Sequence, residues 1–196
     1  MQKENGYSKS NVTKKKIFDA ATHLINEKGF YNTTVSDITK AANVAKGAFY
    51  YYFETKHDII TYAYSIMDSI YEEAFLLTKN EQGFKDKLTV FAVKAYEELE
   101  KQIGLEAIKM STIMALSTDI NPLGAQPSLT KSLKMLYDEA LENDEICDIP
   151  FDTFSVSLMS CFVGSEYFWI VSNNENPLTE NLKMNLEIFI NGVICK

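Results

Sequence analysis

The stretch NVAKGAFYYYFETKHDII, residues 43–60, contains five consecutive aromatic side chains behind a lead-in of small residues. Five consecutive residues cannot share one face of a helix, because helical side chains repeat with a period of about 3.6 residues. We therefore expect Phe49 and Phe53 to point inward, where they hold neighbouring helices together. Tyr50 and Tyr51 should present their hydroxyls outward, and the remaining tyrosine of the run could do either.

The residues before this stretch predict two helices. From residue 12 to 28 apolar residues recur at helical spacing, and Gly29 then provides a C-terminal stop. Thr34 can cap a second, short helix that carries Asp37 near its positive dipole end. Asn43 tolerates the left-handed conformation that ends this helix. A tight turn then leads into a third helix, from about residue 45 to 51.

The pattern stays helical after the aromatic run. Thr55 and Asp58 repeat the capping pattern and start a long fourth helix. Further helices are expected at roughly 84–101, 105–117, 128–143, 151–172 and 179–194. No window alternates convincingly with period two. The sequence therefore predicts an all-α protein of about nine helices, with a three-helix N-terminal domain at 1–57 and a helical C-terminal domain at 58–196.

Charge divides at the same boundary. The chain of 196 residues has a formal net charge of −8, but residues 1–57 hold nine lysines against five carboxylates, a net charge of +4 that leaves −12 for the rest. A basic head on an acidic body indicates that the head meets a polyanion. The alternative is that the lysine run at 14–16 is a solvated helix start.

Two short helices joined by a tight turn and packed on a longer first helix form a helix-turn-helix, in which the second short helix enters the major groove of DNA. Gly47 and Ala48 lie in that second helix. Glycine costs about 1 kcal/mol against alanine in a helix, so it suits close approach to bases and phosphates better than stability.

The segment TVSDITKAANVAKGAFYYYFETKHDII, residues 34–60, resembles the DNA-binding signature of TetR-type transcriptional regulators. The shared features are a small residue pair in the turn before the third helix, an aromatic run ending in Phe, then a lysine and an acidic helix start. The resemblance covers about the first third of the chain. It implies that Thr34, Val35 and Ser36 contact phosphate and the groove edge, and that Lys46, Gly47 and Ala48 face bases. It also implies contacts of Tyr50 with the DNA backbone, of Tyr51 with base methyls or phosphate, and of Lys56 with a phosphate.

All 19 basic residues are lysines. Arginine is the usual bidentate reader of guanine, whereas lysine acts as a point charge with weaker geometric discrimination. We therefore expect an A·T-rich operator, read through thymine methyls, Lys46 and groove shape, with lysines supplying salt-dependent phosphate affinity.

One such head reads only a few base pairs, so useful specificity calls for a homodimer on a palindromic double-stranded DNA operator. The helix at 151–172 is apolar or small almost all the way round, more than one core requires, and 179–194 carries a second apolar stripe. The family resemblance implies that these helices pair into a four-helix bundle. The alternative is that both are internal.

The middle of the C-terminal domain is the expected chamber for a small apolar or aromatic effector, because thioethers and aromatic rings suit an adaptable cavity. They suit an ordinary core as well. The candidates are Tyr62, Met67, Phe91, Tyr96, Met110, Met114, Met135, Tyr137, Phe162, Glu166 and Trp169. Glu166 needs a partner or a shifted pKa in so apolar a helix. It could receive a cationic ligand, bond across the dimer or face solvent.

The fourth helix continues from the head into the body, so a ligand that favours one tilt of it would alter the spacing of the two recognition helices. Repression relieved by ligand is the expectation that the family resemblance implies, and activation remains possible. The alternative function is a DNA-binding regulator whose C-terminal domain binds a protein partner or no ligand.

No glycine-rich phosphate loop, carboxylate and histidine cluster or activated cysteine pair stands out, so we expect neither an enzyme nor a cofactor. Cys147, Cys161 and Cys195 are widely spaced and indicate reduced packing residues. His23 and His57 share no ligand spacing, so no metal site is expected.

The N-terminal residues lack the apolar segment of a secretory signal. The apolar stretches around residues 161–164 and 167–171 fall short of the roughly 18 residues that cross a bilayer. We expect a cytoplasmic protein that does not enter a membrane.

Overall fold

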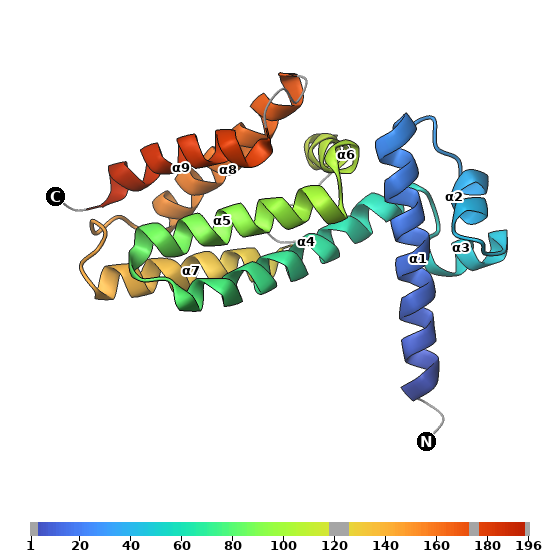
Figure 1. Ribbon diagram of the computed structural model, residues 1–196, viewed down its shortest axis with the longest axis horizontal. Coiled ribbons are helices and arrows are strands. Elements are labelled where there is room, and N and C mark those ends of the chain that lie inside the picture. Colours follow the sequence, from blue (N-terminus) through green and yellow to red (C-terminus); the bar gives the residue numbers. More distant parts are fainter. Residues whose placement is uncertain (1–3, 118–125, 173–176, 195–196) are drawn as a thin grey trace. The chain divides into compact units, whose positions relative to one another are not determined.

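The computed structural model describes residues 4–117, 126–172 and 177–194. These described residues form nine α-helices, one short 3-10 helix and no strand (Figure 1), which confirms the all-α prediction. The helices are α1 (Glu4–Lys28), α2 (Val35–Ala41), α3 (Lys46–Tyr52), α4 (His57–Leu77), α5 (Gly83–Gln102), α6 (Leu105–Ser117), α7 (Pro127–Glu142), α8 (Phe151–Val171) and α9 (Leu178–Val193), with the 3-10 helix η1 at Thr78–Asn80.

Helix α1 begins at Glu4, so the predicted start at residue 12 was wrong. Its first two turns are polar and lack the apolar stripe by which the rest of the helix was recognised. Helix α3 lies within one residue of its predicted bounds.

The chain packs as two compact units. The first unit holds the described residues of 1–65 and 100–120, and the second holds those of 66–99 and 121–196. The first unit thus contains not only α1, α2 and α3 but also the start of α4, the end of α5, and α6. The predicted boundary at 57/58 divides the chain by expected function, and it stays a prediction.

In the first unit, α2 and α3 lie beside α1 (Figure 1) around an aromatic core. Phe49 and Phe53 are buried, with ring centroids 5.6 Å apart, as the sequence predicted. Phe18 of α1 and Tyr62 of α4 meet edge to face at 5.2 Å. Phe18, Phe49 and Phe53 are at most 2% exposed, and full burial of a side chain of this size stabilises the fold by about 1.5–3 kcal/mol.

Helix α2 begins with the capping box that the sequence predicted. Thr34 Oγ1 accepts a hydrogen bond from the Asp37 amide at 3.1 Å, and the Asp37 carboxylate accepts from the Thr34 amide at 3.0 Å. Lys28 donates to the same carboxylate at 2.8 Å. The Lys28 ammonium and the Thr34 bonds hold the pKa of Asp37 well below its usual range. Asn43, at φ 49°, adopts the expected left-handed turn.

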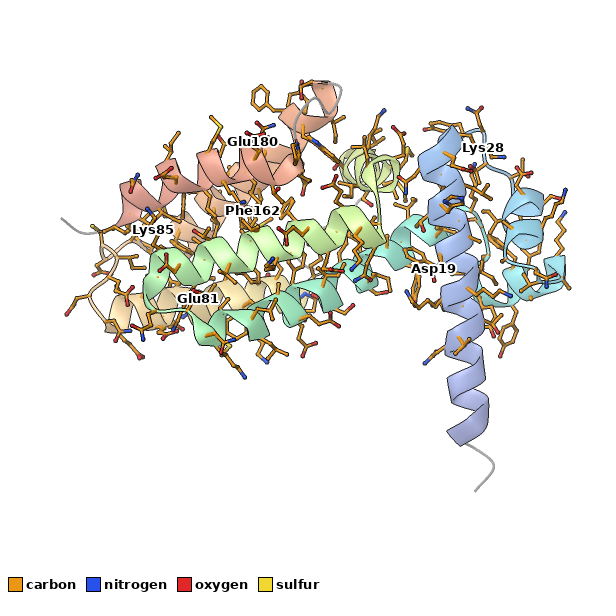
Figure 2. All side chains as sticks on the ribbon, viewed as in Figure 1. Asp19, Lys28, Glu81, Lys85, Phe162 and Glu180 are labelled. Carbon is orange, nitrogen blue, oxygen red and sulfur yellow. The ribbon has the colours of Figure 1, made fainter. Side chains whose placement is uncertain are left out.

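In the second unit, α8 and α9 form the most extensive helix pair. Phe154 of α8 meets Phe84 of α5, Tyr137 of α7 and Phe189 of α9, with ring centroids 5.1–6.0 Å apart. Phe162, two turns further along α8, points into the same core (Figure 2). This packing fixes the faces of α8 that remain exposed.

Candidate nucleic-acid interface and effector site

Helix α3 turns two tyrosines to solvent. Tyr50 is 50% exposed and Tyr51 78% exposed, while Phe49 and Phe53 on either side are buried. Tyr52 is half-buried, and its ring lies edge-on to that of Tyr51 at 4.8 Å. The inward and outward division predicted from the sequence is confirmed, and the phenol groups are available to a ligand of the first unit.

The start of α3 is open as well. Lys46 and Gly47 are exposed, and a Cβ placed on Gly47 would meet no described atom within 4 Å. Packing within the chain therefore does not require glycine here, which leaves close approach of another molecule as a reason for it. Ala48 is half-buried and offers less surface than the sequence suggested.

At the start of α2, Thr34 and Ser36 are exposed and Val35 is half-buried. The Thr34 hydroxyl already takes part in the capping box. A phosphate contact at Thr34 would therefore compete with the cap, whereas Ser36 has its hydroxyl on the exposed side of the helix.

Lys56 has a structural role. Its ammonium donates to the carbonyl oxygens of Phe30 and Thr33, the latter at 2.8 Å, and lies 4.2 Å from the centre of the Phe30 ring. Burial lowers the pKa of Lys56. The side chain thus holds the α1–α2 loop against the start of α4, and any phosphate contact would have to share the same ammonium.

The second unit encloses a polar group in its core. Glu166 of α8 is half-buried, and its carboxylate accepts a hydrogen bond of 2.7 Å from the buried Tyr96 hydroxyl of α5. Burial raises the pKa of Glu166, and the Tyr96 bond partly opposes that shift. Glu166 has thus found its partner within the protomer, an arrangement that none of the three sequence-based alternatives included.

Tyr71 of α4 belongs to the same cluster and was missed by the sequence analysis. It is buried, its ring lies 6.2 Å from that of Phe91, and burial together with the negative charges of Glu166 and Asp68 raises the pKa of its hydroxyl. Its position one helical turn after Met67, a predicted chamber residue, was the signal that could have identified it.

The other predicted effector residues divide between the two units. Met67, Phe91, Tyr137, Phe162 and Trp169 are buried in the second unit. Tyr62, Met110 and Met114 lie in the first unit, where Tyr62 packs on Phe18 and Phe53. Met135 is 47% exposed, so its predicted place in a chamber was wrong. On α7 it faces outward, away from the buried stripe.

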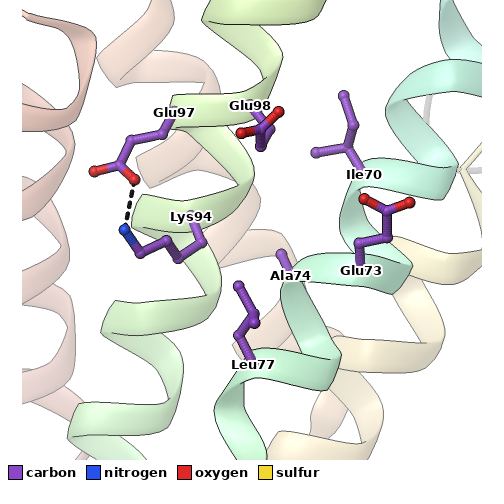
Figure 3. A pocket seen from close by; sticks show the side chains of 7 residues that line it. All are labelled: Ile70, Glu73, Ala74, Leu77, Lys94, Glu97 and Glu98. Atoms are coloured by element: carbon purple, nitrogen blue, oxygen red, sulfur yellow. Dashed lines mark hydrogen bonds and ion pairs between the residues drawn. The ribbon is translucent and has the colours of Figure 1, made fainter.

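A groove of about 380 Å³ lies between α4 and α5 of the second unit (Figure 3). Its lining consists of Ile70, Glu73, Ala74, Leu77, Lys94, Glu97 and Glu98. Lys94 and Glu97, one turn apart on α5, form an ion pair of 2.7 Å along its rim. The predicted effector residues do not line this groove. Among them, the rings of Tyr96 and Phe162 pack together with centroids 5.7 Å apart.

Helices α8 and α9 leave a broad apolar surface exposed, which we call the α8–α9 face. Its large apolar side chains are Val156, Val163, Tyr167, Phe168, Val171, Met184 and Ile188. Surfaces of this kind mark sites of interaction in soluble proteins.

By length and composition alone, α8 could cross a membrane, because an 18-residue window within it has a mean hydropathy of 1.4 and is 28% buried. The expectation that no apolar stretch is long enough was therefore wrong for α8, since Ser165 and Glu166 interrupt the run without ending it. A helix that contributes to a core or an interface passes the same test.

Among the described residues, His, Cys, Asp and Glu form no group of three that could hold a metal ion. Cys161 is a free thiol. Burial raises the pKa of the Cys161 thiol, which disfavours its reactive thiolate form.

Residues 17–63 match the family model described as bacterial regulatory proteins, tetR family. The chain is 27% identical over 189 residues to the biofilm operon icaADBC HTH-type negative transcriptional regulator IcaR of Staphylococcus epidermidis, a match that covers 90% of this chain and 98% of that protein. IcaR of Staphylococcus aureus strain Newman is 26% identical over 136 residues, a match that covers 65% of this chain and 70% of that protein.

Solved structures share the fold. The fatty acid degradation regulator FadR from Bacillus halodurans superposes with a TM-score of 0.76 at 20% identity, over 90% of this chain and 94% of that one. FadR from Bacillus subtilis, solved in complex with stearoyl-CoA, superposes with a TM-score of 0.74 at 22% identity. The match covers 90% of this chain and 97% of that one.

Lys46→Ala should weaken binding to a selected DNA duplex by roughly tenfold and reduce the dependence of log K on log salt by about one unit, because one phosphate or base-edge charge is lost. Tyr51→Ala should weaken binding without changing the salt slope. Fluorescence anisotropy between 50 and about 200 mM salt measures both. The charge-matched control is Lys131→Ala, at an exposed position on α7. Equal effects of the Lys46 and Lys131 variants would contradict the assignment of α3 as the DNA-reading helix.

Glu166→Gln should raise Tm near neutral pH by a few degrees, since about 1 kcal/mol corresponds to roughly 2–4 °C at this chain length. The raised pKa of Glu166 means that the folded chain holds this proton more tightly than the unfolded chain. The free energy of unfolding of the wild-type chain therefore falls as pH rises from the pKa of Glu166 in the unfolded chain through its pKa in the folded chain. At acid pH, where the carboxyl group is protonated in both states, Glu166→Gln should no longer raise Tm. Thermal melts from pH 4 to 8 test this, with exposed Glu73→Gln as control.

Proposed function

We propose that this chain, a TetR-type DNA-binding transcriptional regulator, is a repressor that binds a palindromic operator as a homodimer and releases it when a small apolar or aromatic effector occupies the second unit. The observation that carries the proposal is the exposure of Lys46, Tyr50 and Tyr51 on a short helix whose inward aromatics are buried. The predicted contacts at Thr34, Ser36 and Gly47 are accessible on the same unit.

Repression is supported by the nature of the relatives. IcaR of Staphylococcus epidermidis is described as a negative transcriptional regulator, and the similarity extends over nearly its whole length. A repressor needs only to occupy its operator, which requires no surface for recruiting another protein. We place this regulator in the cytoplasm, where its DNA target lies, and assign it no enzymatic activity or cofactor.

An effector with an apolar body is supported by the solved neighbours and by the core of the second unit. FadR proteins of this fold were solved with stearoyl-CoA and with lauroyl-CoA. In this chain, Tyr96 donates to the Glu166 carboxylate and packs its ring on Phe162. We assign the effector to this cluster, which would open by moving side chains that are now in contact.

Helix α4 links the effector cluster to DNA binding. Its residues up to Ser65 belong to the first unit and those from Ile66 to the second, within one continuous helix. A ligand that favours one orientation of α4 would change how the two recognition helices of a dimer are spaced. A hundredfold preference supplies about 2.7 kcal/mol, enough to release a modestly bound operator.

The α8–α9 face is the proposed dimer contact. Gly164 and Gly192 lie on these two helices, and a Cβ on either would meet no described atom within 4 Å, so a partner could approach the backbone there. Charged side chains at the centre of such an interface would be buried without a partner and would oppose association.

Val163→Glu and Ile188→Glu should therefore each convert a dimer into monomers and reduce operator affinity by more than tenfold, because one head alone makes half of the contacts. Sedimentation velocity and anisotropy measure the two effects. Leu76→Glu on α4 serves as control, because this apolar residue is 51% exposed and Val163 is 48% exposed. Variants that stay dimeric would exclude the α8–α9 face.

Selection of duplexes from random DNA should yield palindromic sites with A·T-rich contacted half-sites, because the chain has lysines but no arginine to read guanine with two hydrogen bonds. On the selected duplex, stearoyl-CoA and lauroyl-CoA should weaken binding at micromolar concentration if the effector has a long apolar tail. G·C-rich half-sites would contradict the readout. Unchanged affinity with these and with smaller aromatic ligands would favour a C-terminal domain that binds a protein partner or no ligand.

A further inference from the structure

Helix α6 begins at a residue that has no side chain with which to cap it. Gly104 stands at the N-cap, since its carbonyl accepts the first helical bond from the Ile108 amide at 3.1 Å. The first amides of any helix lack partners within the helix, and a capping side chain normally accepts from one of them. At Gly104 this group must come from elsewhere in the chain.

Asn26 of α1 supplies the missing cap. Its Oδ1 accepts a hydrogen bond of 2.9 Å from the Glu106 amide in the first turn of α6. Its Nδ2 donates to the Ile103 carbonyl, also at 2.9 Å. One amide side chain therefore binds the backbone on both sides of Gly104, from a helix nearly 80 residues earlier in the sequence.

The same contact explains the glycine. Gly104 has a φ of +79°, which L side chains rarely adopt. A Cβ at this position would lie 2.1 Å from Asn26 Nδ2, well inside any permitted contact. Asn26 and Gly104 are thus complementary: the glycine leaves the space that the asparagine occupies.

A second polar contact ties α6 to the first unit. The buried Tyr64 hydroxyl of α4 donates to the Ser111 carbonyl at 2.8 Å, at the middle of α6. Helix α6 therefore belongs to the same unit as α1, α2 and α3. The chain passes from this unit to the second one shortly after α6 ends.

We propose that Asn26 is a positioning residue that couples α6 to the DNA-binding helices, so that the conformation that binds DNA is the one in which this cap is closed. The inference rests on the proposed function, since it names a contact, additional to the continuous helix α4, through which DNA binding and α6 influence each other. The Tyr64 contact holds the middle of α6, whereas the first turn packs through the buried Ala107 and Ile108 and takes its polar cap from the exposed Asn26 side chain.

Coupling is reciprocal, so DNA binding must stabilise the closed cap by the same factor by which the closed cap favours DNA binding. The Glu106 amide reports the state of the cap directly. With the cap closed it donates to Asn26 Oδ1, and with the cap open it exchanges with solvent.

The test is hydrogen exchange of the α6 first turn in the full-length protein, with and without a duplex obtained by selection from random DNA. In the wild-type chain the duplex should slow exchange at Glu106 by about tenfold, within the usual range of coupling between sites. In Asn26→Ala the exchange should be fast in both states, and affinity for the duplex should fall by a similar factor.

Asn26→Asp keeps the acceptor for Glu106 and loses the donor to Ile103, so it should retain most of the duplex-dependent protection even if Asn26→Ala folds poorly. Asn32→Ala, which removes an exposed asparagine bond to the Lys28 carbonyl in the same unit, is the matched control and should behave as wild type. If Asn26 has only a structural role, Asn26→Ala should lower Tm and speed exchange at Glu106 by the same factor with and without the duplex. The ratio of the two exchange rates, which we call the protection ratio, would then be preserved.

Preserved duplex-dependent protection in Asn26→Ala would overturn the coupling and leave the proposed function standing. A wild-type chain that binds no duplex at low salt would overturn both. Loss of the protection ratio in Asn26→Ala, with the ratio kept in Asn32→Ala, would establish Asn26 as the link.

Discussion

The burial of Phe49 and Phe53 beneath α3 is the constraint on which the first unit depends. These two rings anchor a helix of only seven residues that no described side chain caps at Ala45. So short a helix is not stable in isolation, because nucleation costs more than a few backbone bonds return. Since the rings fix its rotation, Tyr50 and Tyr51 are necessarily turned to solvent. The surface proposed to bind DNA is therefore a consequence of the packing of the core.

Polar side chains then hold the neighbouring segments to this core by binding backbone. Lys56 donates to carbonyls of the α1–α2 loop, and Asn26 caps α6 from α1. Both use groups that a simple division into surface and core would assign to solvent. A basic residue in the head is therefore not automatically a DNA contact, whereas Lys46 on α3 remains exposed for the contact proposed for it.

The second unit combines an enclosed carboxylate with an exposed apolar face. Glu166 is retained at the cost of desolvation, offset in part by the Tyr96 hydroxyl. Outward from it along α8, Tyr167 and Phe168 are exposed although they are aromatic. Ionisable groups usually lie at the surface and aromatic rings in the core, and α8 departs from both rules. Such departures are expected where binding takes place.

The sequence by itself determined the helices, the capping box at Thr34 and the inward and outward sides of the aromatic run, because each depends on residues within one or two turns. Only the tertiary structure decided that Glu166 pairs with Tyr96, that Met135 faces outward, that Lys56 binds carbonyls and that Asn26 caps α6. These outcomes join residues separated by more than 20 positions, or depend on which helix face a neighbour covers. Local periodicity shows that a helix has a buried side, but it does not show which distant group meets it.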